Sequence, residues 1–265
     1  MAGASKSSIR CQTKSISLPC RSHPITSEIE ELLNKIKTTA EEAASADAIC
    51  RALSQLTRLY KSMDDLLTSS TTHVLMSREQ NKKWVDEFVD DSVKYLDICK
   101  SISDMLSEIK VQNRELVCAL RRKKGELSCE NSIKKYNCFR KRMKKDVRGL
   151  IGSLKRVDNT ISGGSVVVDS DDHQLAAVIK ALMHKGIVTC EDQQENGIGN
   201  EFEGIDAALR ILCKYGVSSE MGNVQIAQCS LERLGDQIES MEGGLECIFR
   251  CLVGTRVSFL NIISH

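Results

Sequence analysis

The sequence predicts an all-α protein, an elongated bundle of long antiparallel helices with a disordered N-terminal arm. Only two prolines occur in 265 residues, Pro19 and Pro24, and both precede the first helical pattern. Proline interrupts helices because it lacks an N–H and clashes with the preceding turn. Aromatic residues, which are enriched in strands, make up only 4% of the chain. The strongest observation is the apolar pattern of residues 224–262.

In residues 224–262 the apolar positions follow one another in steps of three and four. The twelve positions of this stripe are Val224, Ala227, Leu231, Leu234, Ile238, Met241, Leu245, Ile248, Leu252, Thr255, Phe259 and Ile262. Such spacing gathers side chains on one face of a helix, whereas a strand would scatter them over both faces. One stripe cannot offset the entropy cost of ordering so long a helix. Other helices must therefore cover it.

The positions beside the stripe favour a central helix of an intramolecular bundle over a homodimeric zipper. A dimeric coiled coil usually has charges at its flanks, but here only Glu242 and Arg256 are charged. Small and apolar flanks, such as Phe249, are expected to widen the buried face. We therefore expect a monomer. The pair Gly243-Gly244 lowers helix propensity and predicts a bend or a close helix crossing.

Residues 1–26 contain no acid, four basic residues and many serines. This composition favours a disordered arm that is too polar to bury anything. It also fits an organellar transit peptide. The helical bundle domain is expected over residues 27–264.

The first two helices have sequence signals at their starts. Ser27 is expected to cap the first, with Glu30 reaching back three residues later. The second is expected to begin near Ser45 and to end at the cluster of residues 69–72, because serine and threonine side chains compete for backbone hydrogen bonds.

A third, long helix is predicted from about Ser77 to Lys124, where a break near Val111 is compatible with the pattern. A basic helix follows, from about Cys129 to Val157. The pattern places six apolar side chains of this helix inward: Ile133, Tyr136, Met143, Val147, Leu150 and Leu154.

The rest of the chain is predicted to contain two irregular segments and two shorter helices. Residues 158–172 form a flexible linker by composition, and residues 191–204 form an acidic loop. Helices are expected over residues 173–184 and 202–215, and Gly216 is expected to lead towards the final helix.

The formal charge of +1 hides a strong asymmetry. Between Arg121 and Arg156 there are fourteen Lys and Arg but three acids, whereas the rest of the chain has 23 basic and 33 acidic residues. The predicted outer face of the basic helix is a candidate patch for an anionic partner. Its residues are Lys134, Lys135, Arg140, Lys141, Arg142, Lys144, Lys145 and Arg148.

Three interpretations of this candidate patch stay open. The simplest is a solvated face that pairs with acidic neighbours. A peripheral membrane contact is the main alternative, because each Lys or Arg near an anionic leaflet contributes about 1 kcal/mol and the helix is amphipathic. Nucleic acid would use the same charges, but no recognition fold or set of stacking aromatics accompanies them.

The twelve cysteines do not predict a disulfide framework. They lie in helical patterns, without a hydrophobic signal peptide or a Cys-x-x-Cys pair. We expect reduced, mostly buried thiols in a cytoplasmic protein. Cys247 and Cys251 are four residues apart, but no His or second Cys pair completes a zinc site. No metal and no cofactor is expected, and the apolar runs are shorter than the roughly twenty residues that span a bilayer.

No motif predicts catalysis. Gly197-Ile198-Gly199 lies in the acidic loop, without the strand and the Lys that phosphate binding needs. His184 lies near Cys190, but a helix end separates them. An enzyme with a Cys nucleophile would need a thiol of depressed pKa in a cleft. We expect a non-enzymatic interaction or scaffold protein with protein partners, located alternatively at a membrane surface or in an organelle.

Several segments of the chain resemble the plant-specific BYPASS-related family, also catalogued as domain of unknown function 241. They are Ser17-Leu18-Pro19, Arg21-Ser22-His23-Pro24, Lys83-Trp84-Val85-Asp86, Leu96-Asp97-Ile98-Cys99, Ala119-Leu120-Arg121-Arg122, Leu182-Met183-His184-Lys185, Gly244-Leu245-Glu246-Cys247-Ile248-Phe249-Arg250 and Thr255-Arg256-Val257-Ser258-Phe259-Leu260-Asn261-Ile262. The resemblance covers residues 15–264. It implies a helical plant protein connected with root and shoot development, without established catalytic activity or catalytic residues.

The chain departs from that family at one junction. Similar members have a further apolar helical stretch between a segment like residues 174–179 and a segment like residues 182–184. Here the two segments abut at Lys180-Ala181. The resemblance therefore implies that a core helix is missing, through a real deletion or a faulty gene model, and that part of the C-terminal stripe lacks a partner.

Overall fold

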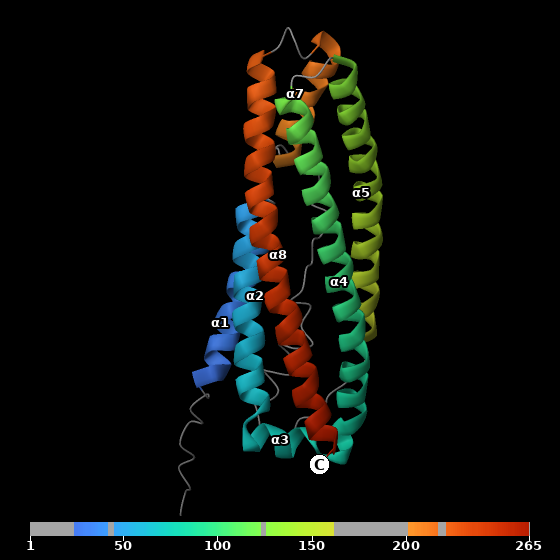
Figure 1. The fold of residues 1–265 in the computed structure, drawn as a ribbon. Coiled ribbons are helices and arrows are strands. Elements are labelled where there is room, and N and C mark those ends of the chain that lie inside the picture. The colour runs from blue at the N-terminus through green and yellow to red at the C-terminus, as the bar shows by residue number, and fades with distance from the viewer. Residues whose placement is uncertain (1–23, 42–44, 123–125, 162–200, 217–220, 265) are drawn as a thin grey trace, which may run out of the picture.

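The structure is a computed structural model and describes residues 24–41, 45–122, 126–161, 201–216 and 221–264. All regular elements in that part of the chain are α-helices, which confirms the predicted all-α class. They are α1 (Pro24–Glu41), α2 (Ala46–Leu67), α3 (Ser70–Met76), α4 (Glu79–Arg121), α5 (Glu126–Ile161), α7 (Glu201–Tyr215) and α8 (Met221–Ser264). Most of them run along one long axis, and α3 crosses the end where α2 meets α4 (Figure 1).

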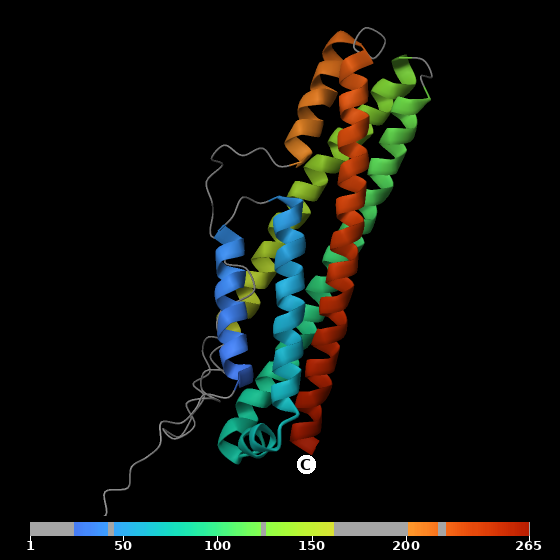
Figure 2. The same cartoon turned by 90° about the vertical axis from the view of Figure 1, so that its left-hand side faces the viewer.

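Helix α8 is the central element of the bundle. It packs mainly against α4 and α2, and its N-terminal part packs against α7 (Figure 2). Eleven of the twelve predicted stripe positions are buried, and the twelfth, Met241, is half-buried. The prediction that other helices cover this stripe is therefore confirmed.

The core consists of three apolar clusters along α8. One joins α4, α5, α7 and α8, and the next joins α1 and α2 to α8. The third lies at the α3 end, where the Phe88 and Phe259 ring centroids are 4.5 Å apart and Trp84 stacks on Phe88 at 5.7 Å. One long helix, α8, thus contributes to all three clusters of an elongated molecule.

The outer face of the C-terminal half of α8 differs from the prediction. Phe249 was expected to widen the buried face, but it is 37% exposed, and Val253, Val257 and Leu260 are exposed beside it. The reason is that α2 and α4 cover only one side of this part of α8. The close crossing predicted at the glycine pair is confirmed, because a Cβ on Gly244 would lie 3.2 Å from Leu53 of α2.

The helix starts are partly as predicted. Ser45 caps α2, since its hydroxyl accepts the N–H of Ala48 at 3.1 Å. Helix α1 begins at Pro24 instead of Ser27, and a proline suits a first turn because the N–H that it lacks would have no partner there. The serine and threonine cluster ends α2 but also starts α3, where the N–H of Thr72 donates to the Ser69 hydroxyl at 3.3 Å.

The boundaries of the later helices correct three expectations. Helix α4 continues through Val111 without a break. Helix α5 reaches Ile161, so the first four residues of the predicted linker 158–172 are helical. Helix α7 begins at Glu201, so the predicted loop 191–204 ends too late. Gly216 ends α7 with a φ of 84°, a conformation that favours glycine.

Several expectations fall outside the described residues. They concern the arm up to residue 23, the helix over residues 173–184, the junction at Lys180-Ala181, and the Gly197-Ile198-Gly199 segment.

Candidate functional site

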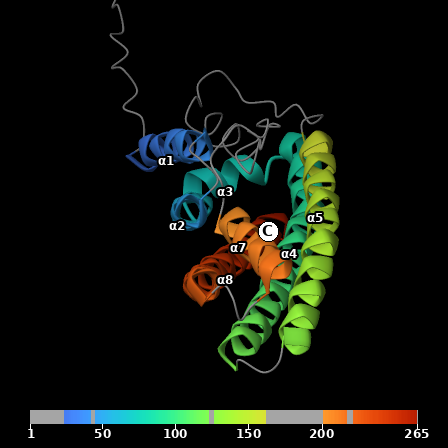
Figure 3. The same ribbon diagram turned by 90° about the horizontal axis from the view of Figure 1, so that it is seen from above.

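Helix α5 lies along the outer edge of the bundle, beside α4 (Figure 3). Its inward face is the predicted one, because Ile133, Tyr136 and Met143 are buried and Val147, Leu150 and Leu154 are half-buried. The packing of this apolar face against α4 and α7 determines which basic side chains reach the surface.

Arg140 does not belong to the outer face, which corrects the prediction for this residue. It is only 7% exposed. Its Nη2 donates to Asp206 Oδ2 of α7 at 3.3 Å, and its guanidinium lies 3.9 Å from the Phe202 ring centroid. The sequence contained a signal for this, since Arg140 follows Ile133 by seven residues and Tyr136 by four, the spacing of the inward face.

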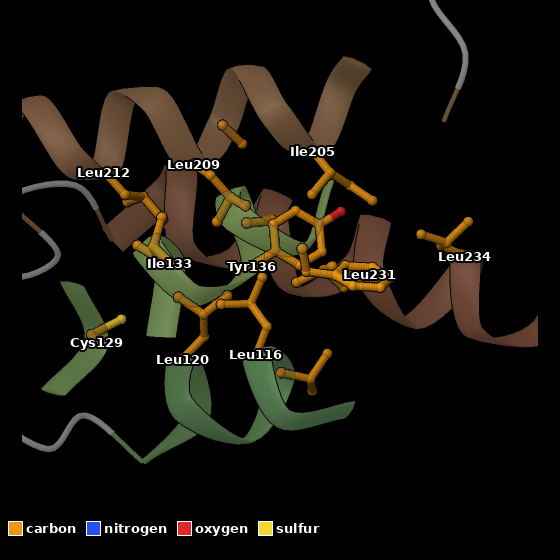
Figure 4. Packing of buried hydrophobic residues seen from close by; sticks show 14 of the residues in the cluster. Leu116, Leu120, Cys129, Ile133, Tyr136, Ile205, Leu209, Leu212, Leu231 and Leu234 are labelled. Carbon is orange, nitrogen blue, oxygen red and sulfur yellow. The ribbon is translucent and has the colours of Figure 1, made fainter. Parts of the chain in front are cut away.

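The surroundings of Arg140 are largely apolar. Figure 4 shows Tyr136 between Ile205 of α7 and Leu231 of α8. Burial raises the pKa of Tyr136, the Arg140 charge lowers it, and the Asp206 charge raises it. Its hydroxyl has no hydrogen-bond partner among the described residues. The buried Arg140 pairs with Asp206 and so links α5 to α7.

Three other residues of the predicted patch are exposed but form ion pairs. Lys134 Nζ lies 2.7 Å from Glu130 of the same helix. Lys135 pairs with Glu115 of α4, and Arg142 pairs with Glu108 of α4. The charges of these residues are thus balanced locally. Exposed pairs of this kind contribute little stability.

The other four residues of the predicted patch, Lys141, Lys144, Lys145 and Arg148, are exposed. They form no ion pair with any described residue. Lys155, which is not part of the predicted patch, is also exposed and forms no ion pair with any described residue. It follows Arg148 by seven residues, so the helical spacing was a usable signal. We call these five residues the basic stripe.

The described cysteines are free thiols, but they are not mostly buried as expected. Only Cys129 is buried, and five are exposed: Cys118, Cys138, Cys213, Cys229 and Cys247. Burial raises the pKa of Cys50, Cys129, Cys213 and Cys251, and it raises the pKa of Cys99 to about 11. Within the described ranges, no group of three or more His, Cys, Asp or Glu side chains is arranged to hold a metal ion.

One of the described helices, α8, is long and apolar enough over residues 222–264 to cross a membrane. Such a helix was not predicted, because every uninterrupted apolar run in the sequence is shorter than a membrane span. Length and composition do not distinguish a membrane span from the core helix of a bundle. Here the apolar stripe of α8 packs on α2, α4 and α7.

The fold and this surface define a class of protein: an all-helical bundle built around one long C-terminal helix, with a basic helix at its edge. A family model described as Protein BPS1 matches residues 52–191 and 176–262. The chain therefore belongs to this family, the BYPASS-related family, as the resemblance implied. No curated protein and no solved structure matches the chain significantly. Membership of the family suggests a developmental role.

Proposed function

We propose that this chain is a non-enzymatic helical interaction protein that acts in plant root and shoot development. Family membership supports the developmental part of the proposal. The observation that carries the interaction part is the basic stripe, five exposed basic residues on one helix with no ion-pair partner among the described residues. In this proposal the protein acts by binding other molecules and needs no cofactor. It is a monomer and is located in the cytoplasm.

The described thiols support the non-enzymatic part of the proposal. A catalytic cysteine needs a depressed pKa, because the thiolate is the nucleophile. Burial instead raises the pKa of Cys50, Cys99, Cys129, Cys213 and Cys251. A raised pKa lowers the thiolate fraction at neutral pH.

Alkylation of individual cysteines as a function of pH tests this point. We expect slow labelling at neutral pH of the five thiols whose pKa burial raises, Cys50, Cys99, Cys129, Cys213 and Cys251. Labelling of Cys99 should approach its full rate only as the pH nears about 11. One thiol that reacts rapidly well below its ordinary pKa of about 8.5 would contradict the proposal and indicate a Cys nucleophile.

A second candidate function is that of a peripheral membrane adaptor, which binds an anionic membrane through α5. The basic stripe favours it because clustered Lys and Arg are attracted to anionic leaflets. Lys135 and Arg142 support a membrane contact less strongly, because the carboxylates of Glu115 and Glu108 neutralise their charges. Flotation with anionic but not neutral vesicles, abolished by high salt, is the expected result. Absence of flotation in both cases would remove this candidate.

A further inference from the structure

We propose that the basic stripe binds an anionic bilayer through the surface charge of the membrane and does not select a particular lipid headgroup. This inference rests on the second proposed function, the peripheral membrane adaptor. It specifies how the stripe, residues Lys141, Lys144, Lys145, Arg148 and Lys155, recognises the membrane.

The five residues lie on one helix in a narrow arc. Residues 141, 145, 148 and 155 are separated by four, three and seven positions, which an α-helix of about 3.6 residues per turn places within about 80° of one another. Lys144 lies beside them. The stripe is about 21 Å long, at roughly 1.5 Å per residue. A charged line of this length can lie across several lipids at once.

A single helix face is convex, and this argues against headgroup selection. Sites that recognise one small molecule are concave and combine polar groups from several elements. Here the neighbouring acids of α4, Glu108 and Glu115, pair with Arg142 and Lys135, residues outside the stripe. Acids of α4 therefore do not interrupt the stripe.

Two further observations concern the approach of a flat surface to α5. Gly152 lies between Arg148 and Lys155 on the same face, and a Cβ there would meet no atom within 4 Å. Packing within the described chain therefore does not require glycine at position 152. Glycine there lowers helix propensity and leaves the surface between Arg148 and Lys155 without a side chain. The one acid between Arg140 and Arg156 is Asp146, which lies about 100° around the helix from Lys145.

The orientation of the bundle on the membrane follows from the position of α5 at the edge of the bundle (Figure 3). Because the stripe runs along the helix axis, the bundle should lie with its long axis parallel to the bilayer. Helix α8 is then held away from the membrane, because α4 and α8 pack together on the inner side of α5.

The test uses the full chain and four probes at low salt. They are neutral phosphatidylcholine vesicles, vesicles with phosphatidylserine, vesicles with a phosphoinositide at the same measured surface potential, and duplex DNA. We expect equal binding to the two anionic vesicles and none to the neutral ones. Stronger binding to the phosphoinositide at equal surface potential would overturn headgroup independence while leaving the adaptor function intact. Binding to no vesicle, with or without binding to DNA, would overturn both.

A matched pair of variants tests the stripe itself. The Lys145→Gln/Arg148→Gln variant removes two unpaired charges, and the Lys135→Gln/Arg142→Gln variant removes two charges that face α4 acids. Both lose one Lys and one Arg from the same helix. Since each charge near the surface contributes about a five-fold factor, we expect about a 30-fold loss for the first and less than about 5-fold for the second.

Circular dichroism controls for folding, and both variants should keep the helicity of the wild type. Equal losses of vesicle binding in the two folded variants would overturn the assignment to the stripe, because overall charge would then explain the attraction.

Discussion

At the scale of single residues, the charges of α5 have three different environments. Arg140 is buried against Phe202 and Asp206, Arg142 pairs with Glu108 at the surface, and Lys145 has no described ion-pair partner. A count of charges in the sequence treats these three residues alike. Their energetic roles differ because a buried charge depends on its partner, whereas an exposed one is stabilised by water.

Replacement of Arg140 tests the importance of the buried pair for stability. Arg140→Gln leaves Asp206 without its cation and removes the stacking on Phe202. We expect the free energy of unfolding to fall by about 1–3 kcal/mol. Urea denaturation followed by circular dichroism measures the change.

The matched control is Arg142→Gln, in which both members of the ion pair are largely exposed. Its cost should be below about 1 kcal/mol. Equal costs for the two substitutions would show that the Arg140 environment is no more important than a surface pair.

Residue patterns predicted seven of the eight outer-face positions of α5, and the error was Arg140. The charge of Arg140 indicated a surface position, whereas its spacing from Ile133 and Tyr136 indicated the inward face. Ion pairing was not predictable in detail, because Glu108 and Glu115 lie far from Arg142 and Lys135 in the sequence, and only the packing of α4 on α5 brings them together.

At the scale of elements, the crossing of α2 and α8 depends on a position without a side chain. Gly244 lies against Leu53, whereas a Cβ on the neighbouring Gly243 would meet nothing within 4 Å. The two glycines therefore have different roles. Gly244 permits the close approach of the helices, and Gly243 only lowers helix propensity.

Alanine substitutions distinguish these roles. Gly243→Ala should raise the free energy of unfolding by about 1 kcal/mol, because alanine is the better helix former. Gly244→Ala should be less stable than Gly243→Ala by about 1 kcal/mol or more, because its methyl group would press on the Leu53 Cβ, which cannot move away without the backbone. Thermal unfolding of both proteins gives the comparison, and equal midpoints would contradict the close crossing.

The sequence predicted the long helices more accurately than the short ones. A stripe repeated over twelve positions specifies α8 clearly, and Ser45 identified the start of α2. Helix α3 was not predicted, because serine and threonine side chains such as those of residues 69–72 can end one helix and also start the next. A short helix with few apolar residues gives little periodicity, and its position is determined by the packing of α2 and α4.

At the scale of the whole molecule, α8 connects all three apolar clusters. The all-α class could be predicted because it depends on local features of the sequence, namely the absence of proline after Pro24 and the spacing of apolar residues. The arrangement of the bundle did not, since contacts such as the hydrogen bond from Asn113 to the Leu231 carbonyl, 2.6 Å long, join distant segments. The same arrangement places α5 at the edge, which exposes the basic stripe.

We expect that one chain forms its own bundle around α8, without a second copy. Hydrogen exchange of the full chain at several protein concentrations tests it most directly. Amides between Leu231 and Leu252 should exchange most slowly, near the rate of global unfolding, and their protection should not depend on concentration. Protection of α8 that appears only at higher protein concentration would contradict this expectation, because a second copy of the chain would then be packing against α8.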